Sequence, residues 1–261
     1  MFLIEPNETA FDLRWRMFGI DVRVHPMFWL LSAFLGWNLM DPDRGGGFKL
    51  LLLWIACVFV SILVHELGHV LMGRVFGTRG HIVLYSFGGL AVGSSALPNR
   101  WQRIAVFFAG PAAGFVLYGL LRVALLFVDV RQLSLFGVMS FVFLLEINLY
   151  WGLLNLLPIW PLDGGQISRD LFGWLMPGRG VSVALGISLL CAGVLAANSL
   201  AAHYGRPLIP LLPAGGLYSA LLFGMLALGS YQAMQQNQFI EKHWVREDPE
   251  PWHRHPDDWK R

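Results

Sequence analysis

Phe48–Val75 has the sequence FKLLLLWIACVFVSILVHELGHVLMGRV, an apolar run long enough to cross a bilayer as one helix. It contains His65-Glu66-Leu67-Gly68-His69. Residues four apart share one face of a helix, so both imidazoles can reach the same metal ion. This stretch therefore predicts a membrane-spanning helix that carries a metal site.

Glu66 lies beside His65, about a quarter-turn round the expected helix, within reach of a water at the metal. Unpaired His and Glu side chains are costly at membrane depth and are rarely kept there without a task. The pattern therefore favours a hydrolytic metal site over a coincidental pair of buried, hydrogen-bonded histidines.

The composition indicates a polytopic membrane protein. Of 261 residues, 56% are hydrophobic and 14% are charged, which is unusual for a soluble domain. The formal net charge is +2 and no basic patch interleaves with aromatic residues. We therefore expect no nucleic-acid partner.

Hydropathy predicts an all-α polytopic fold with about six transmembrane helices, each close to the length that a hydrocarbon core requires. A short glycine-bounded region at 77–93 is β-branched and aromatic, which favours one or two strands between the second and third helices. The expected spans are 24–40, Phe48–Val75, 104–128, 133–157, 181–200 and 208–233.

Basic residues predict the orientation. Arg74, Arg79, Arg100 and Arg103 follow the second span, whereas Arg131 alone lies between the third and fourth. Under the positive-inside rule, this bias places both termini in the cytoplasm. We expect a multi-pass protein of the cell (inner) membrane.

A catalytic zinc commonly takes three protein ligands, so two histidines leave one ligand to be found. The best candidate is Asp163, within the stretch NLLPIWPLDGG at 155–165. Its two prolines interrupt the fourth span, and its paired glycines permit unusual backbone dihedrals directly after the acid. Such breaks beside polar groups shape cavities in membrane proteins.

At these two motifs the chain resembles the site-2 protease family of intramembrane zinc metalloproteases, peptidase family M50. The likeness rests on 65–69 and 155–165, where Leu162-Asp163-Gly164 is similar to the second motif of the family. Softer likenesses are Ser86-Phe87-Gly88-Gly89 and Phe108-Ala109-Gly110-Pro111.

The resemblance implies one Zn²⁺ per chain, held by His65, His69 and Asp163, with Glu66 as general base and acid. It also implies that the substrate is a transmembrane helix of another protein, cleaved within the lipid bilayer. A regulatory membrane partner is compatible with this role.

Two asparagines are candidates for contacts with the substrate or its oxyanion. Asn155 is the first choice as a donor to the developing negative charge, although it could instead pair with carbonyls freed by the prolines. Asn148 lies one to two turns earlier, where an interhelical hydrogen bond is the favoured role.

A substrate helix must unwind before its scissile amide is accessible. An edge strand around 82–90 could bind the extended segment by β-augmentation, with Phe87, Gly88 and Gly89 as the candidate residues. The alternative is that this loop only closes the cytoplasmic mouth.

We expect three parts: a cytoplasmic segment at 1–23, a six-helix transmembrane metalloprotease domain at 24–233 with its core at 48–172, and a polar cytoplasmic tail at 234–261. Two alternative functions remain open. One is a zinc peptidase that acts on substrates outside the membrane, and the other is a metal transporter. The few ionisable groups in the outer halves of the spans disfavour transport.

Overall fold

The computed structural model describes residues 5–41, 47–86, 88–210 and 216–244, with side chains through residue 239. The chain divides into two compact units, Met1–Asp170 and Leu171–Arg261, whose boundary falls inside helix α5. Each unit is described by itself.

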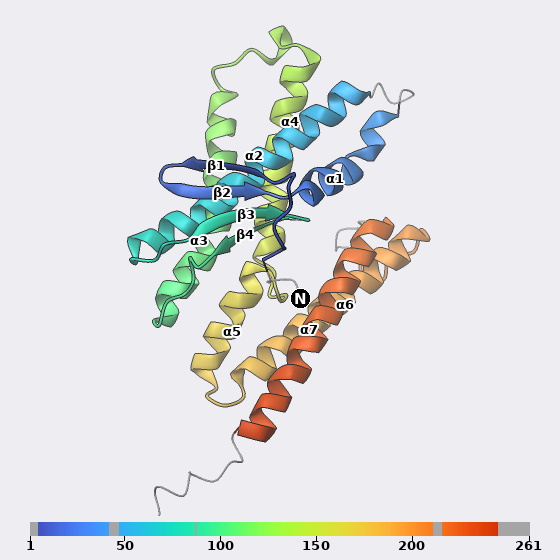
Figure 1. Ribbon diagram of the computed structural model, residues 1–261. Helices are drawn as coiled ribbons and strands as arrows, with labels where there is room; N and C mark the ends of the chain where they lie inside the picture. Colours follow the sequence, from blue (N-terminus) through green and yellow to red (C-terminus); the bar gives the residue numbers. More distant parts are fainter. Residues whose placement is uncertain (1–4, 42–46, 87, 211–215, 245–261) are drawn as a thin grey trace, which may run out of the picture. The chain divides into compact units, whose positions relative to one another are not determined.

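The first unit combines helices with one small sheet (Figure 1). Helix α2 matches the predicted span residue for residue, and α3 and α4 lie within four residues of their expected bounds. The all-α membrane fold with a small β region is therefore confirmed. The helices are α1 (Pro26–Leu35), α2 (Phe48–Val75), α3 (Arg100–Ala124), α4 (Leu135–Asn155) and α5 (Asp163–Leu175), with 3-10 turns η1 (Trp37–Met40) and η3 (Val130–Gln132).

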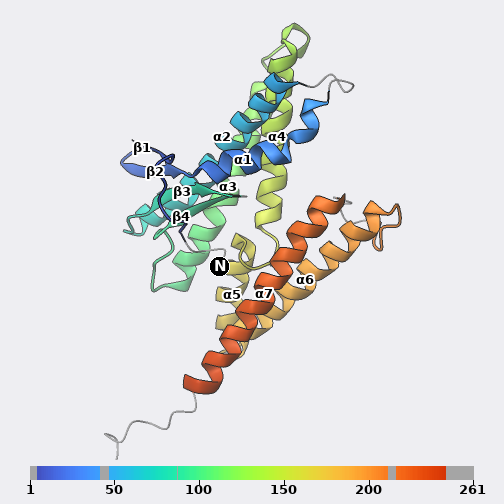
Figure 2. The ribbon, with the colours of Figure 1, turned by 45° about the vertical axis from the view of Figure 1, so that its right-hand side comes forward.

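The sheet has four strands in the order β1-β2-β3-β4, which can be followed in Figure 2. The predicted strands of 77–93 are present as β3 (His81–Tyr85) and β4 (Gly88–Val92), which pair antiparallel. A hairpin that was not predicted, β1 (Leu13–Met17) and β2 (Ile20–Val24), extends the sheet through a parallel β2–β3 pairing. As a result, β4 is an edge strand of the described sheet.

The span expected at 24–40 needs correction. Val24 belongs to β2, and α1 covers ten residues, about 15 Å of helix, which is too short to cross a bilayer. Helix α1 ends at Leu35, and at the next residue, Gly36, a side chain would lie 2.3 Å from the Trp54 ring of α2. The close approach to α2 thus accompanies the end of the helix.

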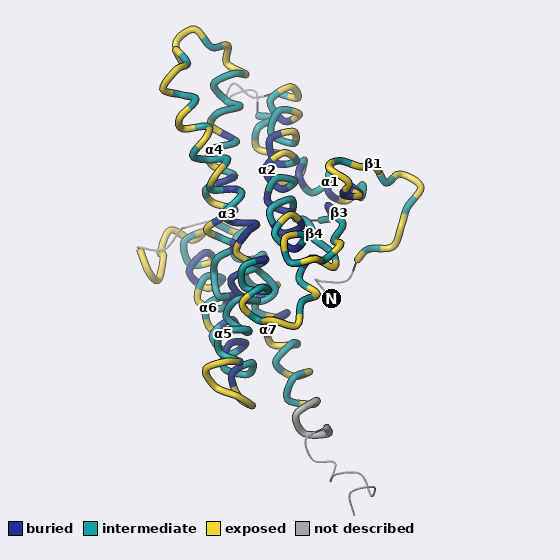
Figure 3. Tube along the Cα trace, turned by 90° about the vertical axis from the view of Figure 1, so that its left-hand side faces the viewer, coloured by how far each residue is buried: buried dark blue, intermediate teal, exposed yellow. Residues whose placement is uncertain are grey.

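The sheet packs on α2 through a common apolar core. The buried residues of α2 can be followed along the helix in Figure 3, where they are dark blue. Burial of these side chains removes apolar surface from water and so fixes the sheet beside the helix. The core residues are Ile20, Val22, Val24, Phe28, Val58, Ile62, Val70, Ile82 and Leu84.

Helices α2 and α3 cross closely because small residues meet at the contact. A methyl group on Gly68 would lie 2.3 Å from the Ala109 carbonyl oxygen and 2.8 Å from the Ala113 Cβ. Small residues allow backbones to approach in this way in membrane helix pairs. The crossing brings α3 against the histidine face of α2.

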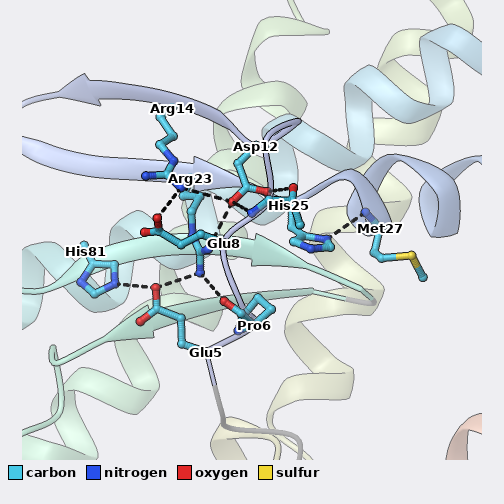
Figure 4. Close-up of polar contacts among 10 residues, drawn as sticks. Glu5, Pro6, Glu8, Asp12, Arg14, Arg23, His25, Met27 and His81 are labelled. Atoms are coloured by element: carbon cyan, nitrogen blue, oxygen red, sulfur yellow. Dashed lines mark hydrogen bonds and ion pairs between the residues drawn. The ribbon is translucent and has the colours of Figure 1, made fainter.

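The segment before β1 is held across the sheet by ionic contacts (Figure 4). Arg23 of β2 is buried and forms ion pairs with Asp12 at 3.2 Å and Glu5 at 2.8 Å. Its guanidinium also donates to the Pro6 carbonyl, and Glu5 reaches His81 of β3 at 3.4 Å. The part of 1–23 that the structure describes is therefore ordered by the sheet.

In the second unit, α6 (Gly180–His203) and α7 (Gly216–Trp244) pair as a hairpin. Buried polar contacts join them, including Ser188 to Ser230 at 2.7 Å. Helix α7 runs to Trp244, so the start of the predicted polar tail is helical, and 245–261 lie outside the described residues.

Five of the described helices are long and apolar enough to cross a membrane, namely α2, α3, α4, α6 and α7. The chain is a multi-pass membrane protein.

Candidate metal centre

Three side chains predicted as ligands converge in the first unit. His65 and His69 lie one turn apart on α2, and Asp163 is the first residue of α5. Asp163 Oδ2 is 3.1 Å from His65 Nε2 and 3.4 Å from His69 Nε2, and the two Nε2 atoms are 3.1 Å apart. These atoms form a group that could hold a metal ion.

The spacing of the three atoms suits a tetrahedral zinc ion. At a ligand distance of about 2.0–2.1 Å, neighbouring donors in a tetrahedron lie about 3.3 Å apart, close to the observed 3.1–3.4 Å. Asp163 Oδ2 is buried and has no hydrogen-bond partner of acceptable geometry among the described residues, despite both nearby imidazoles. Its lone pairs are therefore available to a metal ion.

Helix α3 orients His69, although it contributes no ligand. The Val106 carbonyl oxygen lies 2.7 Å from His69 Nδ1 and can only accept, so Nδ1 carries the proton. That tautomer leaves the Nε2 lone pair of a neutral ring facing the other donors. Gly110, one turn further along α3, makes room for the ring, because a methyl group there would lie 2.2 Å from Nε2.

Asp163 is presented by a tight turn between α4 and α5. Helix α4 ends at Asn155, and α5 begins eight residues later at Asp163. A methyl group on Gly164 would lie 2.2 Å from the Leu156 carbonyl oxygen, and one on Gly165 would lie 2.5 Å from that of Ile159. The paired glycines therefore let the start of α5 pack directly on the turn.

Glu66 is buried and faces β4. A methyl group on Gly89 would lie 2.4 Å from Glu66 Cγ and 2.6 Å from Oε1. The edge strand thus approaches the acid as closely as a residue without a side chain permits.

The outer edge of β4 faces away from β3 at Gly89 and Ala91. The Leu84 carbonyl, opposite Gly89, points away from β4, because it accepts a hydrogen bond from the His25 amide on the other side of β3. The Ala91 carbonyl likewise accepts from Ser94 instead of β3. In an antiparallel ladder the N–H and C=O of one residue point the same way, so both groups of Gly89 point outward.

The remaining candidates are the residues predicted to contact the oxyanion or the substrate strand. Asn155 is buried and its Nδ2 donates to the Trp151 carbonyl at 3.0 Å. Asn148 donates to Ser61 of α2 at 2.9 Å, which is the interhelical bond favoured for it. Neither belongs to the ligand group. Gly88 lies in β4, and Phe87 lies outside the described residues.

Sequence reasoning missed the contribution of α3. The stretch Phe108-Ala109-Gly110-Pro111 was noted only as a likeness, although a glycine in an apolar helix signals a close contact. The Val106 contact is made by the main chain and has no sequence signature. Asp170 of α5 pairs with Arg103 of α3, and no local sequence pattern marks that pair.

Comparison with known proteins identifies a matching family model and a similar solved structure. The model of peptidase family M50 matches residues 53–134 and 129–195, more than half of the chain. Among solved structures, the site-2 protease from Methanocaldococcus jannaschii superposes with a TM-score of 0.55 at 22% identity, covering 85% of this chain and 94% of that one. That likeness shows the fold.

Curated relatives share about a third of the aligned residues. Rip3 of Mycobacterium tuberculosis, whose name provisionally assigns it to the zinc metalloproteases, is 33% identical over 201 residues, 72% of this chain and 49% of that protein. The zinc metalloprotease MJ0392 of Methanocaldococcus jannaschii is 28% identical over 192 residues, 70% of this chain and 54% of that protein. The chain spans about half the length of the curated relatives it matches.

Proposed function

This chain belongs to peptidase family M50, and from that membership we propose that it is an intramembrane zinc metalloprotease. It would hydrolyse a peptide bond within or near a transmembrane helix of another membrane protein. The observation that carries the proposal is the convergence of His65, His69 and Asp163 next to the buried Glu66.

His65, His69 and Asp163 would hold the zinc ion. Zinc bound in such a set supplies a Lewis acid that activates water and polarises a peptide carbonyl. Glu66 takes the proton from the attacking water and returns it to the leaving amine. Asn155 is the proposed donor to the developing oxyanion, through the amide hydrogen not used by Trp151.

The edge strand β4 is the proposed site for the unwound substrate. The N–H and C=O of Gly89 point outward beside Glu66, so an extended peptide could add there as a further strand. Strand addition would replace the helical hydrogen bonds that the substrate loses. This arrangement supports a peptide substrate over an ion in transit.

We also propose that the protein resides in the cell membrane with the loop after α2 and the C-terminus in the cytoplasm. The expectation that the N-terminus is also cytoplasmic depended on a sixth span at 24–40, which α1 is too short to supply. The arginines that follow α2 support this orientation. The substrate strand and the metal centre would then lie toward the cytoplasmic side.

The test uses the full chain in lipid vesicles with a single-pass reporter. We expect the wild type to bind one zinc ion and to cut the reporter, and Glu66→Gln to keep the zinc and lose the cut. Asp163→Ala should lose both. Glu8→Gln, at a side chain that is 70% exposed, is the matched control and should behave as the wild type.

Cleavage by Glu66→Gln at the wild-type rate would reject Glu66 as the base. A wild-type protein that takes up no zinc from a zinc buffer would reject the metal centre itself.

A further inference from the structure

The third ligand sits on a helix that has a second acid on the same face. Asp163 is the first residue of α5 and Asp170 comes seven residues later. Seven residues are close to two helical turns, so both carboxylates project from one side of α5. What holds Asp170 therefore sets the direction in which α5 presents Asp163.

Asp170 is held by a single guanidinium. Arg103 Nε lies 3.0 and 3.2 Å from the two carboxylate oxygens, and Nη2 also donates to Oδ1. The side chains are only 29% and 17% exposed. A two-pronged pair of this kind fixes angle as well as distance, which a single lysine contact would not do.

The same guanidinium anchors the chain that leads from β4 into α3. Arg103 Nη1 donates to the Leu97 carbonyl at 2.9 Å and to the Pro98 carbonyl at 3.1 Å. Arg103 thus joins three segments of the first unit: the connection after the edge strand, α3 and the middle of α5.

Helix α3 already orients another ligand. Val106, whose carbonyl holds His69, comes three residues after Arg103 on this helix. One turn of α3 therefore contacts the elements that supply His69 and Asp163, while contributing no donor of its own.

We propose that Arg103 and Asp170 are positioning residues for the metal centre, which set the angle at which α5 presents Asp163. This inference rests on the zinc site of the proposed function. Groups that orient metal ligands typically account for about 10- to 100-fold in metal affinity, so the pair should act on zinc binding before any cleavage is measured.

The experiment measures zinc affinity of the full chain in detergent, by competition with a chelating dye. Asp170→Asn and Arg103→Gln should each bind zinc about 10- to 100-fold more weakly than the wild type. The exchanged pair Arg103→Asp with Asp170→Arg should recover part of the loss. Arg100→Gln is the matched control, because it removes an arginine from the first turn of the same helix, and it should keep wild-type affinity.

A second measurement separates positioning from folding. The thermal midpoint of the metal-free protein should change little in Asp170→Asn. The positioning role is overturned if both single variants keep wild-type zinc affinity. It is also overturned if each loss of affinity is matched by a lowered thermal midpoint of the metal-free protein, because the loss then reflects folding. Absence of zinc binding by the wild type contradicts the proposed function, which makes the two failures distinguishable.

Discussion

His69 donates its Nδ1 proton to the main-chain carbonyl of Val106 across 2.7 Å. The ligand face of one helix is thereby fixed by the backbone of its neighbour. Because a carbonyl cannot be removed by a side-chain substitution, the contact is best tested through the glycine that lets the helices approach.

Gly110→Ala should displace the His69 ring. The added methyl group would lie 2.2 Å from Nε2, and neither helix backbone can yield easily. We expect zinc affinity to fall at least about 10-fold, measured as metal per purified chain after dialysis against a zinc buffer.

Gly119→Ala is the control for that substitution. It lies on the same helix, and nothing comes within 4 Å of its added methyl group. Full zinc occupancy in Gly110→Ala would show that the ring does not depend on this close contact.

Gly89→Ala should separate catalysis from metal binding. Its methyl group would lie 2.4–2.6 Å from the Glu66 side chain, so β4 or the carboxylate must move. A displacement of about 1 Å at a reacting group can cost about 10²-fold in rate. We expect kcat/KM for reporter cleavage to fall by about that factor, with zinc retained.

The neighbouring Gly88→Ala offers a graded comparison. Its methyl group would meet only the far edge of the Trp151 ring, at 3.3 Å. Equal loss of activity in both variants would mean that β4 is disturbed as a whole and that the loss does not come from the contact between residue 89 and Glu66.

Gly68→Ala should destabilise the α2–α3 crossing. The new methyl group would lie 2.3 Å from the Ala109 carbonyl oxygen. Overpacking of this kind costs about 1–3 kcal/mol, so the thermal midpoint of the metal-free protein should drop. Gly186→Ala on α6, where nothing lies within 4 Å of the methyl group, should leave the midpoint near the wild-type value.

Arg23→Gln should release the segment before β1. It removes two ion pairs and leaves the buried Asp12 carboxylate with only the longer contact to Arg14, at 3.5 Å. Hydrogen exchange across 5–24 should speed up, whereas α2 should stay protected. Arg16→Gln in the same hairpin, whose arginine is 69% exposed, should change exchange little, and similar exchange in both variants would contradict the role of Arg23.

Acid should weaken the same contacts. Burial by itself raises the pKa of Asp12, but hydrogen bonds from Thr9 and the charge of Arg23 outweigh it and lower the pKa to about 2. The folded pKa lies below the unfolded one, so the stabilisation is present above pH ~4 and is lost as the pH falls through about 2. In Asp12→Asn, this part of the pH dependence should disappear from the exchange profile of 5–24.

The elements that sequence reasoning located best are those dominated by one local signal. The ends of α2 follow from its apolar run, and the two motifs identify the three donors that the structure brings together. Each of these features is encoded within a few turns of chain.

The hairpin β1–β2 was missed although its signal was present. Leu13, Trp15 and Met17 alternate with Arg14 and Arg16, a period of two that is typical of a strand. The short α1 was mistaken for part of a span because its apolar composition continues through η1.

The contribution of α3 was predictable only in part, for a different reason. Gly110 signals a close helix contact but does not identify the partner, and Val106 acts through its carbonyl, which no residue type marks. The Arg103–Asp170 pair joins residues 67 positions apart, and nothing local links them.

The outward edge of β4 bears on selectivity. A strand that pairs with a substrate only through main-chain groups does not distinguish most substrate side chains. Gly89 has no side chain that would exclude a bulky substrate residue beside it. Substrate choice would then depend on how readily each transmembrane helix unwinds. Glycine, proline or asparagine in the substrate helix would affect cleavage more than a consensus sequence around the cleaved bond.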